Sequence, residues 1–341
     1  MAKSPYDIVA HLDNFPYSDA KPTLHADLFD RYHALRVEGI DADLGYIPTT
    51  LVRRIPWPDK DWVVVDRPRA VVLMTPPETP ASRSVRTQMM EAVVHRMLEA
   101  GCTEIRDGWR DERFPVYGPD GDVVFEIERS ASAYFGVVTS GVQMLGYVVD
   151  DDGVENARIR LWIAKRSMRK QTYPGMLDCT AAGALAVGQT PRSTVMLEAA
   201  EEASIPSAVL KKGLRRSGCI SYFHVKGLGS QLGGDGSMAL LLPEVEYLYE
   251  LQLDPGTVPR PWDGEVENFR LWDADQVLDA LRRGLFKPNS AVAVIDFLLR
   301  HGLISQEIEP RYVEMVTRLH RRLPLPWRQN WDDEDMFWMG L

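Results

Sequence analysis

The first third of the chain combines helical and extended patterns of apolar residues. Apolar side chains recur every three or four positions and predict a helix over residues 24–38. The Pro- and Trp-rich stretch 53–62 is predicted to be a connection or a sheet edge, because proline offers no N–H to a strand ladder. A second helix is predicted over 82–100, and a hairpin over 114–128 around the turn Pro119–Asp120–Gly121.

Beyond Tyr134 the pattern becomes extended and then mixed. The predicted strands are 135–150, 157–166, 214–225 and 244–253, and the predicted helices are 191–203, 273–284, 289–301 and 310–322. In the last strand Glu244 and Glu246 alternate with apolar residues, so one face is largely polar. Strands followed by interleaved helices indicate an α/β or α+β layer structure, with a domain boundary near residue 130.

Length and composition fit a soluble chain of about two globular domains. Of its 341 residues, 45% are hydrophobic and 26% are charged. The formal net charge of −10 opposes binding to nucleic acid and to anionic membranes, so neither is an expected partner. The sequence shows no signal peptide, no apolar run of membrane-spanning length and only three scattered cysteines. We therefore expect a cytoplasmic protein with reduced thiols.

The segment 183–205 carries the most specific chemistry. Thr190 and Pro191 form a typical helix start after a loop bracketed by two glycines. Glutamates then follow at i, i+3 and i+4, so they project from one helix face within an arc of about 100°. They are Glu198, Glu201 and Glu202. Like charges this close repel one another, and a hard divalent cation such as Mg²⁺ would neutralise them. A solvated acidic face is the alternative interpretation.

This segment resembles the Nudix box, whose pattern is G-x5-E-x7-R-E-apolar-x-E-E-x-G-apolar. Gly183, the three glutamates and Ile205 match it in register, with Ala199 as a small apolar residue. Flanking stretches are similar to the fungal and plant Nudix branch that hydrolyses thiamine diphosphate derivatives, including oxidised ones. They are KRSMRKQTYPGMLD (165–178), EEASIP (201–206), LLPEVEYLYEL (241–251), PWDGEVENF (261–269), FKPNSA (286–291) and RYVEMVTRLHRRLP (311–324).

The resemblance also covers the N-terminal part, where GWRDERFPVYG (108–118) and residues 125–148 are similar to the domain that precedes the box in that branch. It implies an α/β fold: a Nudix α/β/α sandwich with a mixed sheet over residues 131–326. A smaller α+β companion domain is implied over 1–130, with an acidic and aromatic tail at 327–341.

In that family the box glutamates hold Mg²⁺ or Mn²⁺ while water attacks a phosphorus of a diphosphate. Glu198, Glu201 and Glu202 are therefore the implied metal ligands and catalytic residues. Glu265 is implied as a more distant ligand or base, and a surface-loop position is its equal alternative.

Three positions depart from the box: Gln189 replaces Glu, Leu197 replaces Arg and Ser204 replaces Gly. The first two can form an ion pair between loop and helix, so their joint replacement leaves no single charge unpaired. We expect Leu197 to pack with apolar residues and the helix to form. Loss of the arginine is expected to leave Glu198 less well oriented, and hydrolysis slow or replaced by another reaction.

Substrate contacts are expected from a basic stretch and from aromatic residues near it. Residues 157–170 contain six basic side chains and no acidic one. Arg166 and Lys170 are the candidates for holding phosphate oxygens, although about half of the basic residues along a strand face solvent. Tyr173 and Phe223, together with Tyr222, are candidates for stacking on a heteroaromatic ring, with a core position as the alternative for each.

The leading prediction is Mg²⁺-dependent hydrolysis of the diphosphate of a thiamine-diphosphate-like small molecule, oxidised or not. Two alternatives stay open: a divergent Nudix enzyme of specialised metabolism that rearranges or eliminates without hydrolysis, and a non-catalytic diphosphate-binding protein. A homodimer is also left open. The glycine-rich loop 227–236 is expected to be a hairpin loop or lid rather than a dinucleotide fingerprint. The end of the chain is expected to fray, or to fold back on the basic stretch or on a partner subunit.

Overall fold

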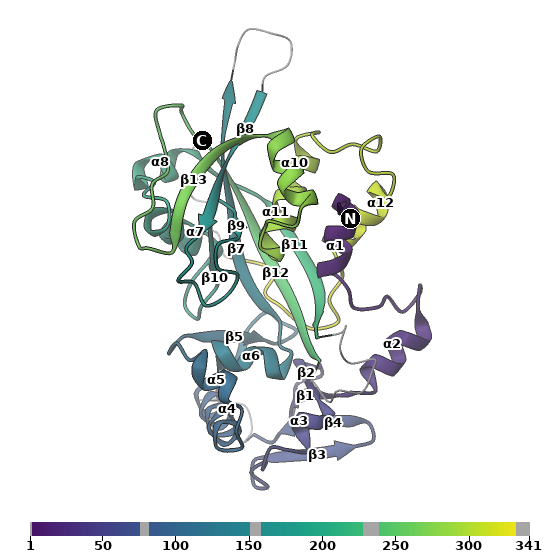
Figure 1. The fold of residues 1–341 in the computed structure, drawn as a ribbon. Helices are drawn as coiled ribbons and strands as arrows, with labels where there is room; N and C mark the ends of the chain where they lie inside the picture. The colour runs from purple at the N-terminus through teal and green to yellow at the C-terminus, as the bar shows by residue number, and fades with distance from the viewer. Residues whose placement is uncertain (1, 76–81, 151–157, 228–238, 332–341) are drawn as a thin grey trace.

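The computed structural model describes residues 2–75, 82–150, 158–227 and 239–331. Two bodies lie one above the other in Figure 1, a larger one around a long twisted sheet and a smaller one beneath it. Within the described ranges, no helix combines the length and the apolar composition of a membrane span. The domain boundary expected near residue 130 stays a prediction.

A seven-stranded mixed sheet forms the larger body. Its strands are β7 (Thr139–Asp150), β8 (Arg158–Arg166), β9 (Leu177–Asp178), β10 (Ala181–Ala184), β11 (Leu214–Lys226), β12 (Leu240–Gln252) and β13 (Val266–Asp273). The main order is β11-β12-β7-β8-β13, while β10 pairs with β7 and β9 with β8. Strands β12 and β7 run parallel and the other pairs antiparallel, which makes the sheet mixed as predicted.

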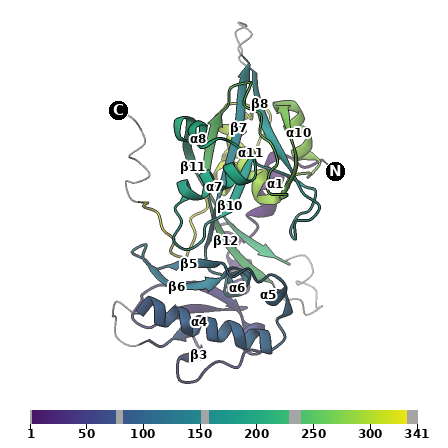
Figure 2. The same ribbon diagram turned by 90° about the vertical axis from the view of Figure 1, so that its left-hand side faces the viewer.

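Helices cover both faces of this sheet, as the view in Figure 2 shows. One face carries α7 (Pro191–Glu201) and α8 (Ser207–Gly213), whose apolar residues share a buried core with Val142, Met144 and Tyr247. The other face carries α10 (Ala274–Arg282) and α11 (Pro288–Arg300), together with α1 (Pro5–Leu12) and α12 (Tyr312–Leu319). The α/β/α layering predicted from the resemblance is thus confirmed.

The register of the sheet separates two neighbouring glycines near the start of β7 and the end of β10. Val142 pairs with Gly183 on one side and with Tyr247 on the other, and it belongs to the core on the α7 face. Gly141 is the next residue along, so it faces the α11 side together with its partner Glu246. Glu198 packs against Gly183 on one face of the sheet, and Glu246 packs against Gly141 on the other.

The smaller body combines two sheets with short helices and one long helix. Its helices are α2 (Pro22–Phe29), α3 (Thr49–Val52), α4 (Ser82–Glu99), α5 (Thr103–Asp107) and α6 (Arg129–Phe135). Its strands are β1 (Tyr32–Val37), β2 (Gly45–Pro48), β3 (Trp62–Asp66), β4 (Arg69–Leu73), β5 (Arg113–Tyr117) and β6 (Val123–Glu128). They form one sheet of order β2-β1-β4-β3 and the hairpin β5-β6, and α4 runs below this hairpin in Figure 2.

One predicted element is wrong and several are confirmed. The helix expected over 24–38 ends at Phe29 as α2, and β1 begins at Tyr32. Strand β1 lies between β2 and β4 and is buried on both faces, so it lacks the alternation of a half-exposed strand. The helix over 82–100 and the hairpin over 114–128 are confirmed. The turn after Asp150, most of the glycine-rich loop and the tail beyond Trp331 lie outside the described residues.

Candidate active site

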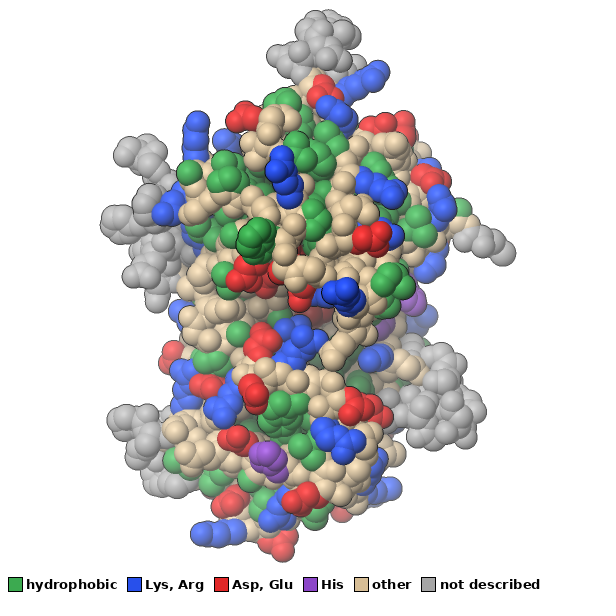
Figure 3. Space-filling view, turned by 60° about the vertical axis from the view of Figure 1, so that its left-hand side comes forward, with side chains coloured by type: hydrophobic (Ala, Val, Ile, Leu, Met, Phe, Trp, Pro, Cys, Tyr) green, Lys and Arg blue, Asp and Glu red, His purple; other side chains and the backbone are tan. Residues whose placement is uncertain are grey.

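A cleft of about 990 Å³ lies where the lower end of the large sheet meets the smaller body. Strands β7, β10 and β12 line it from above, and Phe114, Arg129 and Val137 line it from below. Figure 3 shows the molecule hollowed between its two bodies, with acidic side chains gathered above the hollow and basic ones close by. The cleft therefore combines groups from both bodies around one space.

Helix α7 places Glu198 and Glu201 in the lining of this cleft. Thr190 caps the helix through the backbone N–H of Ser193, so the predicted helix start is in place. Glu198 lies against β10 so closely that a Cβ at Gly183 would overlap its carboxylate. Glu202 is buried and accepts the backbone N–H of Ala182 at 2.9 Å. The glycine of the box is thus needed for the close approach of helix and strand.

Burial and neighbouring negative charges raise the pKa of two box glutamates, Glu198 and Glu202. Burial raises the pKa of Glu198 to about 7, and the negative charges of Glu265 and Glu201 add to this effect. Burial also raises the pKa of Glu202 well above its usual range, with Asp178 and Glu198 contributing. Such mutually repelling oxygens favour a positive ligand between them.

The donor set fits a hard divalent cation in kind and in charge. Carboxylate oxygens are what Mg²⁺ and Mn²⁺ prefer. Glu198 and Glu201 supply them in the lining of the cleft, and Glu202 is buried next to Ala182 of that lining. Across the described residues, no three His, Cys, Asp or Glu side chains lie close enough together to form a complete set of metal ligands. Mg²⁺ commonly completes its coordination with waters and substrate phosphates rather than with protein groups alone.

The two basic candidates have different surroundings. Arg166 is buried, donates to Asp178 Oδ2 at 2.6 Å, and also donates to the backbone oxygens of Thr172 and Tyr173 at 2.9 and 3.1 Å. It therefore shapes the loop at the rim of the cleft, because its guanidinium already holds three oxygens. Lys170 forms an ion pair with Glu265, and both side chains line the cleft. The sequence did not predict that these two candidates would contact each other.

The aromatic candidates also differ in their exposure and in their distance from the cleft. Tyr173 is 46% exposed at the rim of the cleft, where a flat ring has room to stack. Tyr222 is buried, lines the cleft and hydrogen bonds to Glu244. Phe223 is 1% exposed and stacks on Phe15 in the core, so the structure places it away from the other candidates.

The three departures from the box have visible consequences. The Oε1 atom of Gln189 accepts the Ala186 N–H and the Thr194 hydroxyl, both at 3.2 Å, so neutral hydrogen bonds hold the loop to the helix. Leu197 is 45% exposed, and the expectation that it packs into apolar surroundings is wrong because its position on α7 faces outward. Ser204 adopts a positive φ of 52°, the conformation that the glycine of the box favours.

Sequence reasoning missed a cluster at the α11 side of the cleft. Glu246 is 2% exposed and lines the cleft, although the alternation in β12 had only indicated a polar face. Lys287 lies nearby, and Asp178 and Glu246 raise its pKa against the opposing effect of burial. Burial alone would raise the pKa of Asp178, but the positive charges of Lys287 and Arg166 lower it below its usual value. The stretch FKPNSA had signalled this region through resemblance alone.

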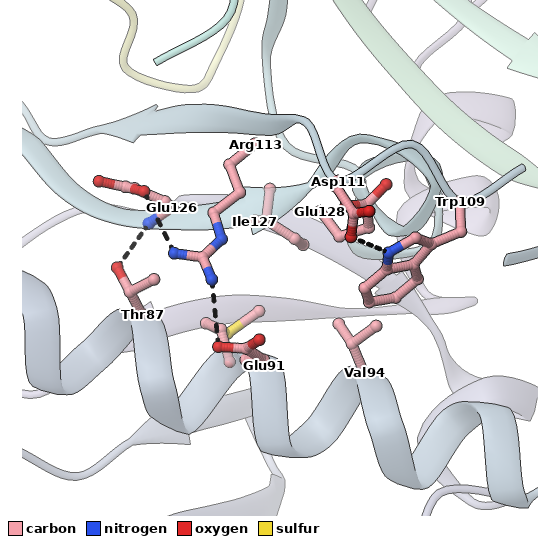
Figure 4. A pocket seen from close by; sticks show the side chains of 10 residues that line it. Thr87, Glu91, Val94, Trp109, Asp111, Arg113, Glu126, Ile127 and Glu128 are labelled. Carbon is pink, nitrogen blue, oxygen red and sulfur yellow. Dashed lines mark hydrogen bonds and ion pairs between the residues drawn. The ribbon is translucent and has the colours of Figure 1, made fainter. Parts of the chain in front are cut away.

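A second pocket, of about 380 Å³, lies in the smaller body between α4 and the β5-β6 hairpin (Figure 4). Arg113 forms ion pairs with Glu91 at 3.3 Å and Glu126 at 3.7 Å. Trp109 donates its indole N–H to Asp111 at 2.6 Å. Because these polar groups already pair with one another, the pocket is a weaker candidate than the cleft at α7.

Comparisons with known proteins identify a family model and several relatives. A family model described as a domain of unknown function (DUF4743) matches residues 29–139. The uncharacterized protein YJR142W of Saccharomyces cerevisiae is 36% identical over 242 residues, which are 71% of this chain and 69% of that protein.

Two Arabidopsis thaliana proteins, chloroplastic Nudix hydrolases 20 and 24, are 35% and 36% identical over 239 and 230 residues. These matches cover 70% and 67% of this chain and 58% of each relative, so the chain spans less than two thirds of their length. With a layered α/β fold and a box-bearing helix at its cleft, the chain belongs to the Nudix hydrolase superfamily.

Proposed function

We propose that this protein hydrolyses the diphosphate of a thiamine-diphosphate-like small molecule, oxidised or not, in a reaction that depends on Mg²⁺ or Mn²⁺. The observation that carries the proposal is the α7 carboxylate cluster, which meets the basic Lys170 at one end of a cleft large enough for such a molecule. The substrate class rests on the resemblance of the flanking stretches to the thiamine diphosphate branch.

In this reaction water supplies an oxygen to a phosphorus of the diphosphate, and the bridging P–O bond breaks. The products are a monophosphate ester and inorganic phosphate, with one proton released. Glu265 is suited to accept that proton, because it lines the cleft and is released from Lys170 when phosphate oxygens take up the ammonium group. Lys170 is suited to contact phosphate oxygens once substrate competes with Glu265 for its ammonium group.

Glu198, Glu201 and Glu202 would hold the divalent cation, and Glu265 would assist from across the cleft. The cation supplies neutralisation of the negative charge on the transferring phosphoryl oxygens. The chain's own residues orient the diphosphate along α7, and the smaller body covers the cleft and limits the access of bulk water.

The test is incubation of the full-length chain with thiamine diphosphate, oxidised and unoxidised, with Mg²⁺ or with EDTA. Release of inorganic phosphate that requires Mg²⁺ supports hydrolysis, and mass spectrometry of the organic product identifies the monophosphate. A product with the mass of the substrate would instead establish rearrangement. Binding detected by calorimetry without any product would establish a diphosphate-binding protein.

We also propose that the chain acts in the cytoplasm. The three cysteines are free thiols in the structure, and reduced thiols are the rule in that compartment. Fractionation of cells that express the full-length protein tests this assignment. Recovery of the protein in an organelle, as the chloroplastic names of the Arabidopsis relatives indicate for those proteins, would contradict it.

A further inference from the structure

The basic side chains that line the cleft differ in whether a carboxylate neutralises them. They are Arg110, Arg129, Arg166, Arg169, Lys170 and Lys287. Arg129, Arg166 and Lys170 each form an ion pair with a carboxylate. The charge of Asp178 acts on Lys287. Arg110 and Arg169, by contrast, form no ion pair within the residues that the structure describes. These two guanidinium groups therefore keep their charge available to a ligand.

Arg110 comes from the smaller body, between α5 and β5, and contacts the larger body across the cleft. Its Nη2 donates to Oε1 of Gln171 at 2.5 Å, and both residues line the cleft. The amide oxygen of Gln171 is neutral, and a guanidinium forms stronger hydrogen bonds with an anionic oxygen than with a neutral one. An anionic ligand in the cleft would therefore displace Gln171 from Arg110.

A buried charged side chain holds each of the two loops that carry these arginines. In the smaller body, Glu128 is buried and accepts the backbone N–H of Arg110 at 3.2 Å. In the larger body, the buried Arg166 donates to two backbone oxygens of the loop that carries Arg169. Because both loops are held before a ligand arrives, binding costs less conformational entropy.

Gln171 also relates Arg110 to the carboxylates of α7. Lys170 directly precedes Gln171 in the chain, and its positive charge acts on Glu198. Figure 3 shows basic side chains beside the hollow between the two bodies, close to the acidic ones. Arg110 therefore lies on the smaller-body side of the same part of the cleft to which α7 contributes its carboxylates.

We propose that Arg110 of the smaller body and Arg169 of the larger one hold phosphate oxygens of the substrate, so that the binding site is complete only when both bodies contribute to it. The inference rests on the proposed function and assigns part of its diphosphate site to the smaller body. A planar guanidinium offers parallel N–H donors that match a phosphate group, and it stays charged at every physiological pH. Arg110 and Arg169 thus bind and orient the diphosphate, while the bond is broken at α7.

The test measures diphosphate binding without turnover. Calorimetry on the full-length protein with Mg²⁺ uses methylenediphosphonate, in which a carbon replaces the bridging oxygen and prevents hydrolysis. Arg110→Gln removes the charge, and its affinity for this probe is expected to fall about ten-fold. Arg110→Lys keeps the charge but loses the fork, so its affinity is expected to be intermediate. Arg169→Gln, at an exposed position, provides a second variant with a loss in the same direction.

Turnover of thiamine diphosphate gives an independent reading. Arg110→Gln is expected to raise KM about ten-fold and to change kcat less than about two-fold, because the contact binds the substrate before and during the reaction. Arg106→Gln is the matched control, since Arg106 lies on α5 of the same body, pairs with Asp107 at 3.6 Å and does not line the cleft. Its KM and its affinity for methylenediphosphonate are expected to be unchanged.

Gln171→Leu separates phosphate binding from a bond that only joins the two bodies. This variant removes the acceptor of Arg110 and leaves the guanidinium in place. If Arg110 holds phosphate, the variant binds methylenediphosphonate at least as tightly as the wild type, because Gln171 no longer competes with the ligand. If the bond serves only to join the bodies, Gln171→Leu and Arg110→Gln lose affinity equally.

Each outcome decides the inference separately from the proposed function. Unchanged affinity in a folded Arg110→Gln variant, equal losses in Arg110→Gln and Gln171→Leu, or no binding of methylenediphosphonate by the wild type would each overturn it. Arg110-dependent binding without phosphate release from thiamine diphosphate would uphold the inference and refute hydrolysis. Phosphate release with an unchanged KM in Arg110→Gln would do the reverse.

Discussion

Acidic groups lie on both the α7 side and the α11 side of the cleft, but the charges around them differ. At the α11 end Asp178 is enclosed by Arg166, Lys287 and the Ser290 hydroxyl, so the charge there is balanced. At the α7 end Glu198 lies among Glu201, Glu265 and Asp263, with Lys170 as a partial counter-charge. Paired charges such as those around Asp178 stabilise the fold next to the cleft, whereas the excess of negative charge around Glu198 favours a bound cation. The α11 side therefore has a structural role, and the α7 side is the candidate for the chemistry.

The largest expected effect concerns the balanced end. Arg166→Met removes one partner of a buried ion pair and leaves Asp178 charged and buried, so it should lower the free energy of unfolding by about 3–5 kcal/mol. Lys170→Met breaks a partly exposed pair and should cost less than about 1 kcal/mol. Denaturant unfolding of both variants measures the difference, and equal losses would contradict the assignment of Arg166 to support.

The next effect concerns the unbalanced end. Glu198→Gln should lower kcat by about a hundred-fold or more, because it removes a proposed ligand of the cation. Without Mg²⁺ the variant should melt no lower than the wild type, since it also removes repulsion among carboxylates.

Glu267→Gln is the matched control for this variant, because Glu267 pairs with Lys165 on the neighbouring strand and does not line the cleft. Phosphate release under saturating substrate gives kcat for both variants. Full activity in Glu198→Gln would remove α7 from the reaction.

A smaller effect concerns pH. Burial and the charge of Glu244 raise the pKa of Glu246 to about 8 in the folded chain, whereas an unfolded glutamate has a pKa of about 4.3. Between these values the folded state binds more protons than the unfolded state, so stability contributed by Glu246 falls as pH rises from about 4.3 to 8. Glu246→Gln should flatten this slope in unfolding measured at several pH values, and an unchanged slope would contradict the shift.

The smallest effect concerns the altered box. The double variant Gln189→Glu with Leu197→Arg should change the free energy of unfolding by less than about 0.5 kcal/mol. Leu197 is largely exposed, and a glutamate at 189 can still accept the two hydrogen bonds that Gln189 accepts. Turnover should rise modestly if the new arginine orients Glu198, and a loss of turnover would indicate that the departures serve another reaction.

The sequence predicted the parts of this comparison that depend on local pattern. Helix α7 follows from its cap and from the spacing of its glutamates, and strands β7, β8, β11 and β12 of the large sheet follow from their apolar runs. Strand β1 did not follow, because burial on both of its faces removes the period-two signal.

The α11 end could not be predicted from pattern, because it depends on which residues the tertiary fold brings together. Phe223 and Tyr222 are neighbours in sequence, yet only Tyr222 lines the cleft. The sequence pattern of β12 is typical of a solvent-facing position for Glu246. In the fold this residue instead pairs with Gly141 on β7 and accepts a hydrogen bond from Asn289 on α11. Likewise the pairing of Lys170 with Glu265 joins residues far apart in sequence.

The most direct test of the central claim is hydrolysis of thiamine diphosphate in water enriched in oxygen-18, with Mg²⁺ and the full-length protein. Hydrolysis at the α7 carboxylates predicts Mg²⁺-dependent formation of a monophosphate and inorganic phosphate, with one label per turnover in one of the two products. Glu198→Gln should lose this incorporation and Glu267→Gln should keep it. A turned-over product that carries no label, or labelling unaffected by Glu198→Gln, would contradict hydrolysis at the α7 carboxylates.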